Sequence, residues 1–309
     1  MRPLHVGIVG TGKVAQEQHI PAIRKNSAFA LSGCAYCAAP VADVPSFASL
    51  EEMLAACPEI AAVAVCTPPQ ARYEAALAAL HNGKHVLMEK PPCPTVMQLD
   101  HLASVAERTG LTLFQTWHLR YATAVQSTQR WLMSRSIRGG RIVWKEDVRQ
   151  WHPGQMWLWQ RDGFGVFDAG INALSVLTQV MAEPIFVQAA DLHIPANCQT
   201  PIAATVQLSS GTALFTAEFD FRHTGSTIWD IELETDQGVA RLSAFGSSLA
   251  VNKDDLMPEP SDDEYQSVYR HFDHLIRERR CDVDERPLKL VADIFLVGRH
   301  HAVAPFDFG

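Results

Sequence analysis

In the first third of the chain, hydrophobic positions follow two alternating patterns. Short continuous apolar runs, of which residues 60–66 are the clearest, are typical of parallel strands buried on both faces. Between them, apolar residues recur at helical spacing, and two of these segments begin with capping sequences, Ser49 with Glu52 and Thr95 with Gln98. After a first strand at the N-terminus, the predicted strands are residues 29–36, 60–66, 85–89 and 111–117, and the predicted helices are residues 49–57, 73–80 and 95–108. Repeated strand–helix–strand units of this length predict a doubly wound parallel sheet with its ligand at the carboxyl ends of the strands.

The pattern changes after about residue 120. Helical spacing predicts helices at residues 123–135, 166–180 and 287–301. Residues 214–221 and 228–235 instead alternate between apolar and polar side chains, as in a sheet with one covered and one more polar face. The acidic, proline-containing residues 254–264 are predicted to form a surface loop. The sequence therefore predicts an α/β fold: an N-terminal Rossmann domain over residues 1–120, with a doubly wound parallel sheet, and a C-terminal α/β domain over residues 121–309, with a large, mainly antiparallel open sheet.

A glycine turn joins the first predicted strand to a helical pattern. Gly10 permits a tight turn, Gly12 lets the backbone approach a pyrophosphate, and the small Ala15 allows the helix to pack on the strand. The N-terminus of that helix offers N–H groups and a partial positive charge to phosphates. The segment therefore predicts a dinucleotide site.

Composition narrows the classes of partner. The 309 residues carry a formal net charge of -8, which argues against nucleic acid or an anionic membrane as partner. No apolar run approaches the ~18 residues of a membrane helix, and the N-terminus enters a strand at once, which leaves no room for a secretory signal. The seven cysteines are scattered, so a disulfide framework is not expected and the expected compartment is the cytoplasm.

Metal and redox sites are not expected either. Cys34 and Cys37 form a C-x-x-C sequence that could be a redox pair, but it ends a strand and has no second pair with which to bind zinc. His300 and His301 lack a ligand constellation.

Two short segments carry candidate chemistry. Lys90 follows a predicted Rossmann strand and precedes two prolines, so a fixed cation there could bind a hydroxyl group and lower its pKa; the alternative is a solvated loop lysine. Asp168 and Asn172 are four residues apart and share one face of a predicted helix among apolar neighbours. The alternative for Asp168 is a helix N-cap.

A third segment, residues 144–159, contains four tryptophans together with acidic and amide side chains. Indole rings beside planar hydrogen-bonding groups suit a sugar, which presents C–H faces and hydroxyls. The alternative is a tryptophan-rich core. We favour the sugar site, because a loop at His152 would leave four indoles little core to fill.

Together, the glycine turn, the Glu89-Lys90-Pro91 sequence and the segment from Asp168 to Asn172 resemble the glucose–fructose oxidoreductase/inositol dehydrogenase/MocA family. The resemblance covers essentially the whole chain and is closest to bacterial members that oxidise D-galactose or L-arabinose. It implies an NAD(P)-dependent oxidation of D-galactose, L-arabinose or D-fucose at C1 to the lactone. Many family members have histidine where this chain has Asn172, and an amide cannot take the alcohol proton.

The resemblance also implies roles for individual residues. Asp168 is the expected general base, Asn172 orients O1, and Lys90 anchors the substrate and supplies positive charge. The residues expected to hold the sugar in addition are His118, Glu146, Trp151, His152 and Trp229. The residues expected to line the cofactor site are Gly10, Gly12, Lys13, Val14, Tyr36, Cys37, Thr67, Pro68, Glu89 and Lys90.

Cofactor and sugar preference remain open. No acid lies between Glu17 and Asp43 to hold a ribose diol, and Tyr36 and Cys37 stand where NADP-preferring relatives carry serine and arginine. We therefore expect both cofactors to be accepted, with a preference for NAD; Arg24 is the nearest basic residue that could change this. Galactose and arabinose differ only in the substituent at C5. A group of that size changes transition-state binding by only ~1–3 kcal/mol, so we expect both sugars to be oxidised.

Two other classes of function stay open. The chain could be a dinucleotide-binding sensor or regulator without turnover, or a reductase of a non-sugar carbonyl or imine. The resemblance also implies a homodimer formed through the second domain.

Overall fold

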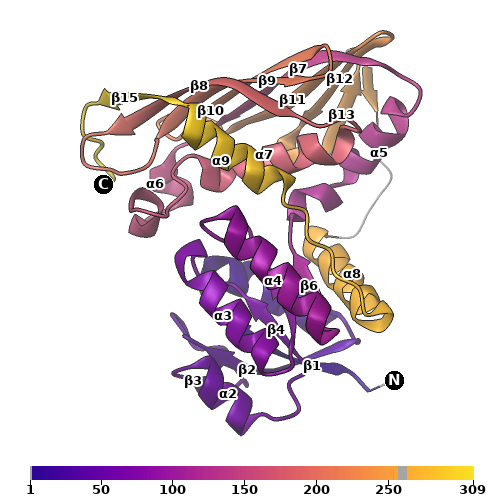
Figure 1. Ribbon diagram of the computed structural model, residues 1–309, viewed down its shortest axis with the longest axis vertical. Coiled ribbons are helices and arrows are strands. Elements are labelled where there is room, and N and C mark those ends of the chain that lie inside the picture. The colour runs from indigo at the N-terminus through magenta and orange to yellow at the C-terminus, as the bar shows by residue number, and fades with distance from the viewer. Residues whose placement is uncertain (1, 253, 257–262) are drawn as a thin grey trace. The chain divides into compact units, whose positions relative to one another are not determined.

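The computed structural model describes residues 2–252, 254–256 and 263–309. The chain divides into two compact units (Figure 1). The first contains the chain through His118 and a later segment that ends at Glu285; the second contains the intervening chain from Leu119 and the residues from Arg286 to Gly309.

Within the described residues, the first unit is built on a six-stranded parallel sheet in the order β3-β2-β1-β4-β5-β6. Its strands are β1 (Leu4–Val9), β2 (Phe29–Ala35), β3 (Ser46–Phe47), β4 (Ala62–Val65), β5 (His85–Met88) and β6 (Leu113–Gln115). The strand order reverses between β1 and β4, so their carboxyl ends form the crevice in which doubly wound sheets bind ligands. The predicted Rossmann sheet is confirmed.

The helices of this unit are the π-helical turn η1 (Ala15–His19), α1 (Ile20–Lys25), α2 (Leu50–Ala56), α3 (Pro69–His81), α4 (Val96–Thr109) and α8 (Glu264–Glu278). Both predicted caps are confirmed: the hydroxyl of Ser49 accepts from the Glu52 amide at 3.1 Å, and that of Thr95 accepts from the Gln98 amide at 3.3 Å. These bonds satisfy backbone donors that would otherwise lack a partner at the helix starts.

Helix α8 belongs to the first unit. The domain boundary predicted from the sequence, at residue 120, would place it in the second. The ring of Phe272 on α8 stacks on Phe29 of β2 and on Phe114 of β6, each at a centroid distance of 6.2 Å. The chain beyond α8 continues this packing, since the backbone of Asp282 exchanges hydrogen bonds with Leu113 and Gln115. The Rossmann unit is therefore completed by residues far along the chain.

In the described chain, the second unit holds a nine-stranded sheet in the order β14-β13-β12-β11-β7-β10-β9-β8-β15. Its strands are β7 (Ile137–Lys145), β8 (Phe186–Pro195), β9 (Ala203–Ser210), β10 (Ala213–Asp220), β11 (Ile228–Thr235), β12 (Gly238–Ser243), β13 (Ser248–Val251), β14 (Asp254–Leu256) and β15 (Arg299–Val303). Only the β7–β10 and β8–β15 pairs among these strands are parallel, so the predicted mainly antiparallel sheet is confirmed.

Helices α5 (Thr123–Leu132), α7 (Phe167–Val180) and α9 (Arg286–Val297) lie along one face of this sheet (Figure 1). The alternation predicted for β10 is present, since Phe215, Ala217 and Phe219 are buried and Thr216 is exposed. Two shorter helices, α6 (Val148–Trp151) and η3 (Met156–Trp159), follow β7.

Two predictions for the chain beyond residue 120 were wrong. The last helix ends at Val297 rather than at residue 301, and residues 299–303 form strand β15. Gly298 interrupts the helix, and the residues after it pair with the edge of β8, which supplies backbone hydrogen bonds that helical spacing cannot reveal. In the acidic segment, residues 254–256 form edge strand β14 and Glu264 begins α8, whereas residues 257–262 lie outside the described residues. No helix in the part of the chain that the structure describes is long and apolar enough to span a bilayer.

Helix α7 is held close to the sheet by a glycine. A Cβ atom added at Gly170 would lie 2.9 Å from Cδ1 of Phe219 on β10. The Phe219 ring also packs edge-to-face on Phe167 at 5.5 Å. Because Gly170 lies between Asp168 and Asn172 on α7, this contact fixes how far both residues lie from the sheet.

We predict that Gly170→Ala lowers the free energy of unfolding by about 1–3 kcal/mol, because overpacking outweighs the better helix propensity of alanine. Urea unfolding of the protein without ligands measures this. Gly12→Ala is the matched control, since a Cβ there meets no atom within 4 Å, and it should leave the urea midpoint unchanged. Equal midpoints for both variants would show that α7 can move away from the sheet without cost.

Candidate functional site

In the glycine turn after β1, Gly10 lies close to the backbone beyond β4, whereas Gly12 faces open space. Gly10 has a φ of +89°, and a Cβ there would lie 2.9 Å from the amide nitrogen of Thr67, just beyond β4. The same test at Gly12 finds no atom within 4 Å. The Thr11 hydroxyl donates to the carbonyl of Ala39 at 2.7 Å, which ties the turn to the loop after β2. The turn therefore fits a dinucleotide pyrophosphate in contact with the backbone.

The end of β2 lies where a second ribose would be recognised in such a fold. Tyr36 is exposed and adopts a φ of 51°. Burial and the neighbouring Cys37 and Cys66 raise the pKa of Cys34 to about 12, which leaves it an unreactive thiol. The guanidinium of Arg24 donates to the carbonyl of Ala42 at 2.8 Å in the loop beyond. Cys34 of the C-x-x-C sequence is therefore held as a neutral thiol.

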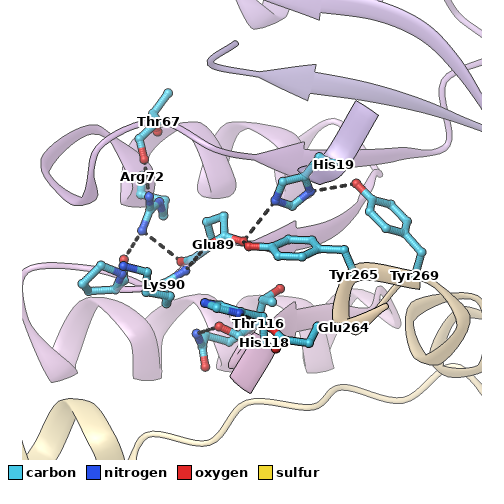
Figure 2. A network of polar contacts seen from close by, with 12 residues as sticks. His19, Thr67, Arg72, Glu89, Lys90, Thr116, His118, Glu264, Tyr265 and Tyr269 are labelled. Atoms are coloured by element: carbon cyan, nitrogen blue, oxygen red, sulfur yellow. Dashed lines mark hydrogen bonds and ion pairs between the residues drawn. The ribbon is translucent and has the colours of Figure 1, made fainter. Parts of the chain in front are cut away.

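The Lys90 turn is fixed from two sides (Figure 2). On one side, the Glu89 carboxylate, 1% exposed, accepts a hydrogen bond from the Lys90 amide at 2.9 Å. On the other, the buried Arg72 guanidinium donates to the backbone carbonyls of Thr67, Glu89 and Pro91. Lys90 itself is half-buried. The backbone that carries Lys90 is therefore fixed.

The remaining oxygen of Glu89 is surrounded by donors from distant segments. Its Oε1 accepts from the Tyr265 hydroxyl at 2.7 Å and pairs with Nε2 of His19 at 3.0 Å, while Nδ1 of His19 lies 2.9 Å from the Tyr269 hydroxyl. Figure 2 shows the rings of His19 and Tyr265 beside the carboxylate, with Tyr269 on the far side of His19. His19 ends η1 and the two tyrosines lie on α8, so three segments meet at one charged group.

The buried pair carries opposite charges. Burial alone raises the pKa of Glu89, but the hydrogen bond and charge of His19, with His118 and Arg72, hold it well below its ordinary value. Burial alone lowers the pKa of His19, but Cys66, Tyr269 and Glu89 together raise it well above its ordinary value. His19 is therefore an imidazolium facing a carboxylate.

His118, at the end of the first unit, is oriented in a similar way. Its Nδ1 lies 2.7 Å from Oε2 of Glu264, and its ring stacks on Tyr265 at 5.5 Å (Figure 2). Sequence reasoning found Lys90, Glu89 and His118 but missed their partners. His19, nine residues after Gly10, gives only a weak signal, and Glu264 and Tyr265 lie too far along the chain to give any.

A second group of candidate residues lies within the second unit. Oε2 of Glu146, just after β7, accepts from the Trp144 indole at 2.9 Å, and its Oε1 lies 3.4 Å from Nε2 of His152. Nδ1 of the same imidazole lies 4.0 Å from Oδ2 of Asp168. Asp168 and Asn172 lie in α7 and are 3% and 4% exposed. A half-buried imidazole thus lies between two buried carboxylates, an arrangement that can both hold hydroxyl groups and accept a proton.

Asp168 is not the N-cap of α7. That position is held by Val166, without a side-chain hydrogen bond, and Asp168 lies in the first turn of the helix. The helix dipole favours a negative charge there. The N-cap role that the sequence left open for Asp168 is therefore excluded.

The tryptophans divide between core and surface. Trp144 and Trp159 are buried, so our preference for the sugar interpretation over a core role was wrong for these two: the sheet and η3 supply the core that the loop sequence did not indicate. Trp151 is 45% exposed and donates to Thr227 at 3.1 Å. Trp229 packs edge-to-face on Trp144 at 6.2 Å, and its buried indole nitrogen has no hydrogen-bond partner among the described residues. A buried donor of this kind suits a bound hydroxyl group.

The candidate residues thus form two groups, one in each unit: Lys90 and His118 with the cofactor turn in the first, and Glu146, His152, Asp168, Asn172 and Trp229 in the second. Within the described chain, no three histidine, cysteine, aspartate or glutamate side chains are grouped to hold a metal ion.

Comparison with known proteins identifies the family. A model of the GFO_IDH_MocA family, described as an oxidoreductase family with an NAD-binding Rossmann fold, matches residues 4–116. The chain is 44% identical over 308 residues to galactose 1-dehydrogenase from Pseudomonas fluorescens, a match that covers 99% of each chain. The chain belongs to the GFO/IDH/MocA oxidoreductase family. The family resemblance recognised from the sequence is confirmed.

Solved structures agree with the fold. D-galactose-1-dehydrogenase from Rhizobium etli superposes with a TM-score of 0.93 at 44% identity, over 99% of each chain. The 3-ketoreductase KijD10 from Actinomadura kijaniata, solved with NADP and TDP-benzene, gives a TM-score of 0.84 at 17% identity, over 97% of this chain and 99% of that one. At that identity the second likeness concerns the fold alone.

The His19–Glu89 pair predicts a pH dependence of stability. The pKa of His19 is higher in the folded protein than in the unfolded chain, where it is about 6.5. The contribution of His19 to the free energy of unfolding is therefore complete below about pH 6.5 and is lost as the pH rises through the folded pKa. Because the folded pKa of Glu89 is lowered, its contribution is complete above about pH 4.3 and is lost at lower pH. The stability difference between wild type and His19→Gln should be largest between these values and fall above about pH 6.5, by up to about 1.4 kcal/mol per pH unit.

Urea unfolding from pH 4 to pH 9 measures this difference. His101→Gln is the control, since His101 is an exposed histidine of the same unit that pairs with Tyr73 at 2.8 Å. The difference in the free energy of unfolding between wild type and His101→Gln should not fall above about pH 6.5. A constant difference between wild type and His19→Gln would mean that His19 is neutral in the folded protein.

Proposed function

We propose that the protein is an NAD(P)-dependent aldose 1-dehydrogenase that oxidises D-galactose and L-arabinose, and also D-fucose, at C1 to the aldonolactone. The observation that carries the proposal is the 44% identity, over 99% of both chains, to a galactose 1-dehydrogenase. The group formed by half-buried His152 with buried Glu146, Asp168 and Trp229 supports it, because carboxylates, imidazole and indole N–H are the groups that bind sugar hydroxyls.

We assign roles from the chemistry of each side chain. Asp168 takes the proton of the C1 hydroxyl, since the Asn172 amide has no basic atom for it. Asn172 orients O1, and Lys90 anchors the substrate and stabilises the negative charge that develops on O1. His118, Glu146, Trp151, His152 and Trp229 are assigned to binding the sugar. Bound NAD(P) supplies the hydride acceptor.

For the cofactor we propose that both NAD and NADP are accepted, with a preference for NAD. The loop after β2 has no acid to hold the ribose diol, and the nearest guanidinium, that of Arg24, donates to the Ala42 carbonyl. Gly10, Gly12, Lys13, Val14, Thr67 and Pro68 are assigned to the pyrophosphate and nicotinamide side of the site, with Tyr36 and Cys37 at the adenosine side.

Initial rates with D-galactose, L-arabinose, D-glucose and D-xylose, each with NAD and with NADP, test the proposal. The first two sugars should be oxidised with both cofactors and faster with NAD, and the last two should react poorly. Discrimination between D-galactose and L-arabinose should be modest, because one C5 substituent is worth only ~1–3 kcal/mol.

Asp168→Asn separates chemistry from folding in the same assay. It should lower kcat by about 10²–10⁴ and leave NAD binding unchanged, because only the proton acceptor is lost. Cofactor binding by the wild type without oxidation of any aldose would contradict the proposal and favour a sensor. Reduction of a non-sugar carbonyl or imine without aldose oxidation would favour a reductase.

We further propose that the protein is a homodimer formed through the face of the nine-stranded sheet opposite α5, α7 and α9. This face carries the Arg141–Glu218 and Lys145–Glu218 ion pairs, at 2.6 and 2.7 Å, beside Leu214, which is 68% exposed. Sedimentation equilibrium should give twice the chain mass of 34.1 kDa, and Leu214→Glu should give the single mass, since it places a charge in an apolar contact. A single mass for the wild type at micromolar concentration would contradict the dimer.

A further inference from the structure

The Glu89 carboxylate is buried among donors of its own unit in the arrangement that the structure describes. It is 1% exposed and receives three donors: the Tyr265 hydroxyl, Nε2 of His19 and the Lys90 amide. An ionised carboxylate only accepts hydrogen bonds, so each of these groups must point its hydrogen at Glu89. The bond to the Lys90 amide fixes the backbone from which the Lys90 side chain projects.

Two neighbouring residues on α8 reach both candidate substrate residues of the first unit. The helix begins at Glu264, and its N-cap Asp263 accepts from the Tyr265 amide at 2.9 Å, which sets the first turn. From this turn, Tyr265 donates to Glu89 and Glu264 pairs with Nδ1 of His118 (Figure 2).

The two contacts have different chemical consequences. The Glu264 carboxylate accepts a hydrogen bond from Nδ1 of His118, which fixes the orientation of the ring and turns its Nε2 edge away from Glu264. The Tyr265 phenol, buried and beside Glu89, has a pKa raised well above its ordinary value, so it stays a donor at every pH at which the protein is folded. Its ring also stacks on His118 at 5.5 Å and meets His19 edge-on at 5.0 Å.

We propose that Glu89, Glu264 and Tyr265 are positioning residues, through which the first turn of α8 orients Lys90 and His118 toward the substrate. Glu89 thereby acts inside the protein and does not contact the cofactor. The proposal rests on the proposed function, because it takes Lys90 and His118 as residues that meet the sugar.

Kinetics of three variants test this proposal. Tyr265→Phe removes one donor to Glu89 and keeps the ring; it should lower kcat for D-galactose about tenfold while the Kd of NAD stays within about twofold, because Lys90 loses its alignment. Glu264→Ala should raise KM for D-galactose by about five- to tenfold, and Glu264→Gln, which can still accept from Nδ1, should restore most of the loss.

Tyr73→Phe is the matched control. It removes a tyrosine hydroxyl that pairs with Nδ1 of His101 at 2.8 Å, in the same unit but away from Glu89, and should change neither constant. A loss of kcat in Tyr265→Phe that follows its fall in Tm, or an equal loss of NAD affinity, would overturn the positioning role.

A measurement without turnover separates this proposal from the proposed function. In protein labelled with ¹⁵N-lysine, the Lys90 amide resonance is identified by its absence in Lys90→Arg. The resonance should move in Tyr265→Phe and stay in place in Tyr73→Phe, because only the first change alters the charge distribution on its acceptor. An unmoved resonance in Tyr265→Phe would overturn the positioning role even if the wild type oxidises galactose, whereas a shifted resonance in a protein that oxidises no aldose would overturn the proposed function alone.

Discussion

A buried carboxylate stays ionised only if donors surround it, and the first unit is organised around meeting that requirement at Glu89. Removing one partner from a buried charged pair typically costs about 3–5 kcal/mol, because the other charge is left without compensation. The donors come from η1 after the cofactor turn, from the Lys90 turn after β5 and from α8. The three segments must therefore assemble together, which explains why α8 returns to the Rossmann unit.

The candidate group in the second unit uses the same types of side chain differently. Glu89 accepts short hydrogen bonds from three donors of its own unit, as suits a residue that holds others in place. His152 lies between Glu146 and Asp168 at the longer distances of 3.4 and 4.0 Å, and the Trp229 indole beside them is buried without a partner among the described residues. Looser contacts around buried polar groups suit a ligand that completes the hydrogen bonds. One group is thus suited to positioning and the other to binding.

Local patterns allowed much of the fold to be predicted from the sequence. The caps at Ser49 and Thr95, the glycine turn and the alternation in β10 each depend on residues within a few positions of one another. What could not be predicted depends on pairing across long separations. Strand β15 exists because the edge of β8 accepts it, more than 100 residues away in sequence, and the burial of Trp144 depends on a sheet that no single segment encodes.

The same distinction applies to the candidate site. Lys90, Asp168 and Asn172 stood out because each lies in a short motif with a recognisable spacing. His19, Glu264 and Tyr265 carry no such motif, since their importance comes from the ring of contacts around Glu89 and His118.

The adenosine end of the cofactor site shows why sequence alone leaves cofactor preference open. The end of β2 carries no carboxylate, and burial keeps the Cys34 thiol neutral. The Arg24 guanidinium lies near this end and donates to the carbonyl of Ala42. Because arginine has five N–H donors, that bond does not exhaust its capacity, and a 2′-phosphate could be met by the donors that remain. An end that has no carboxylate for a ribose diol and keeps donors for a phosphate supports the proposal that both cofactors are accepted.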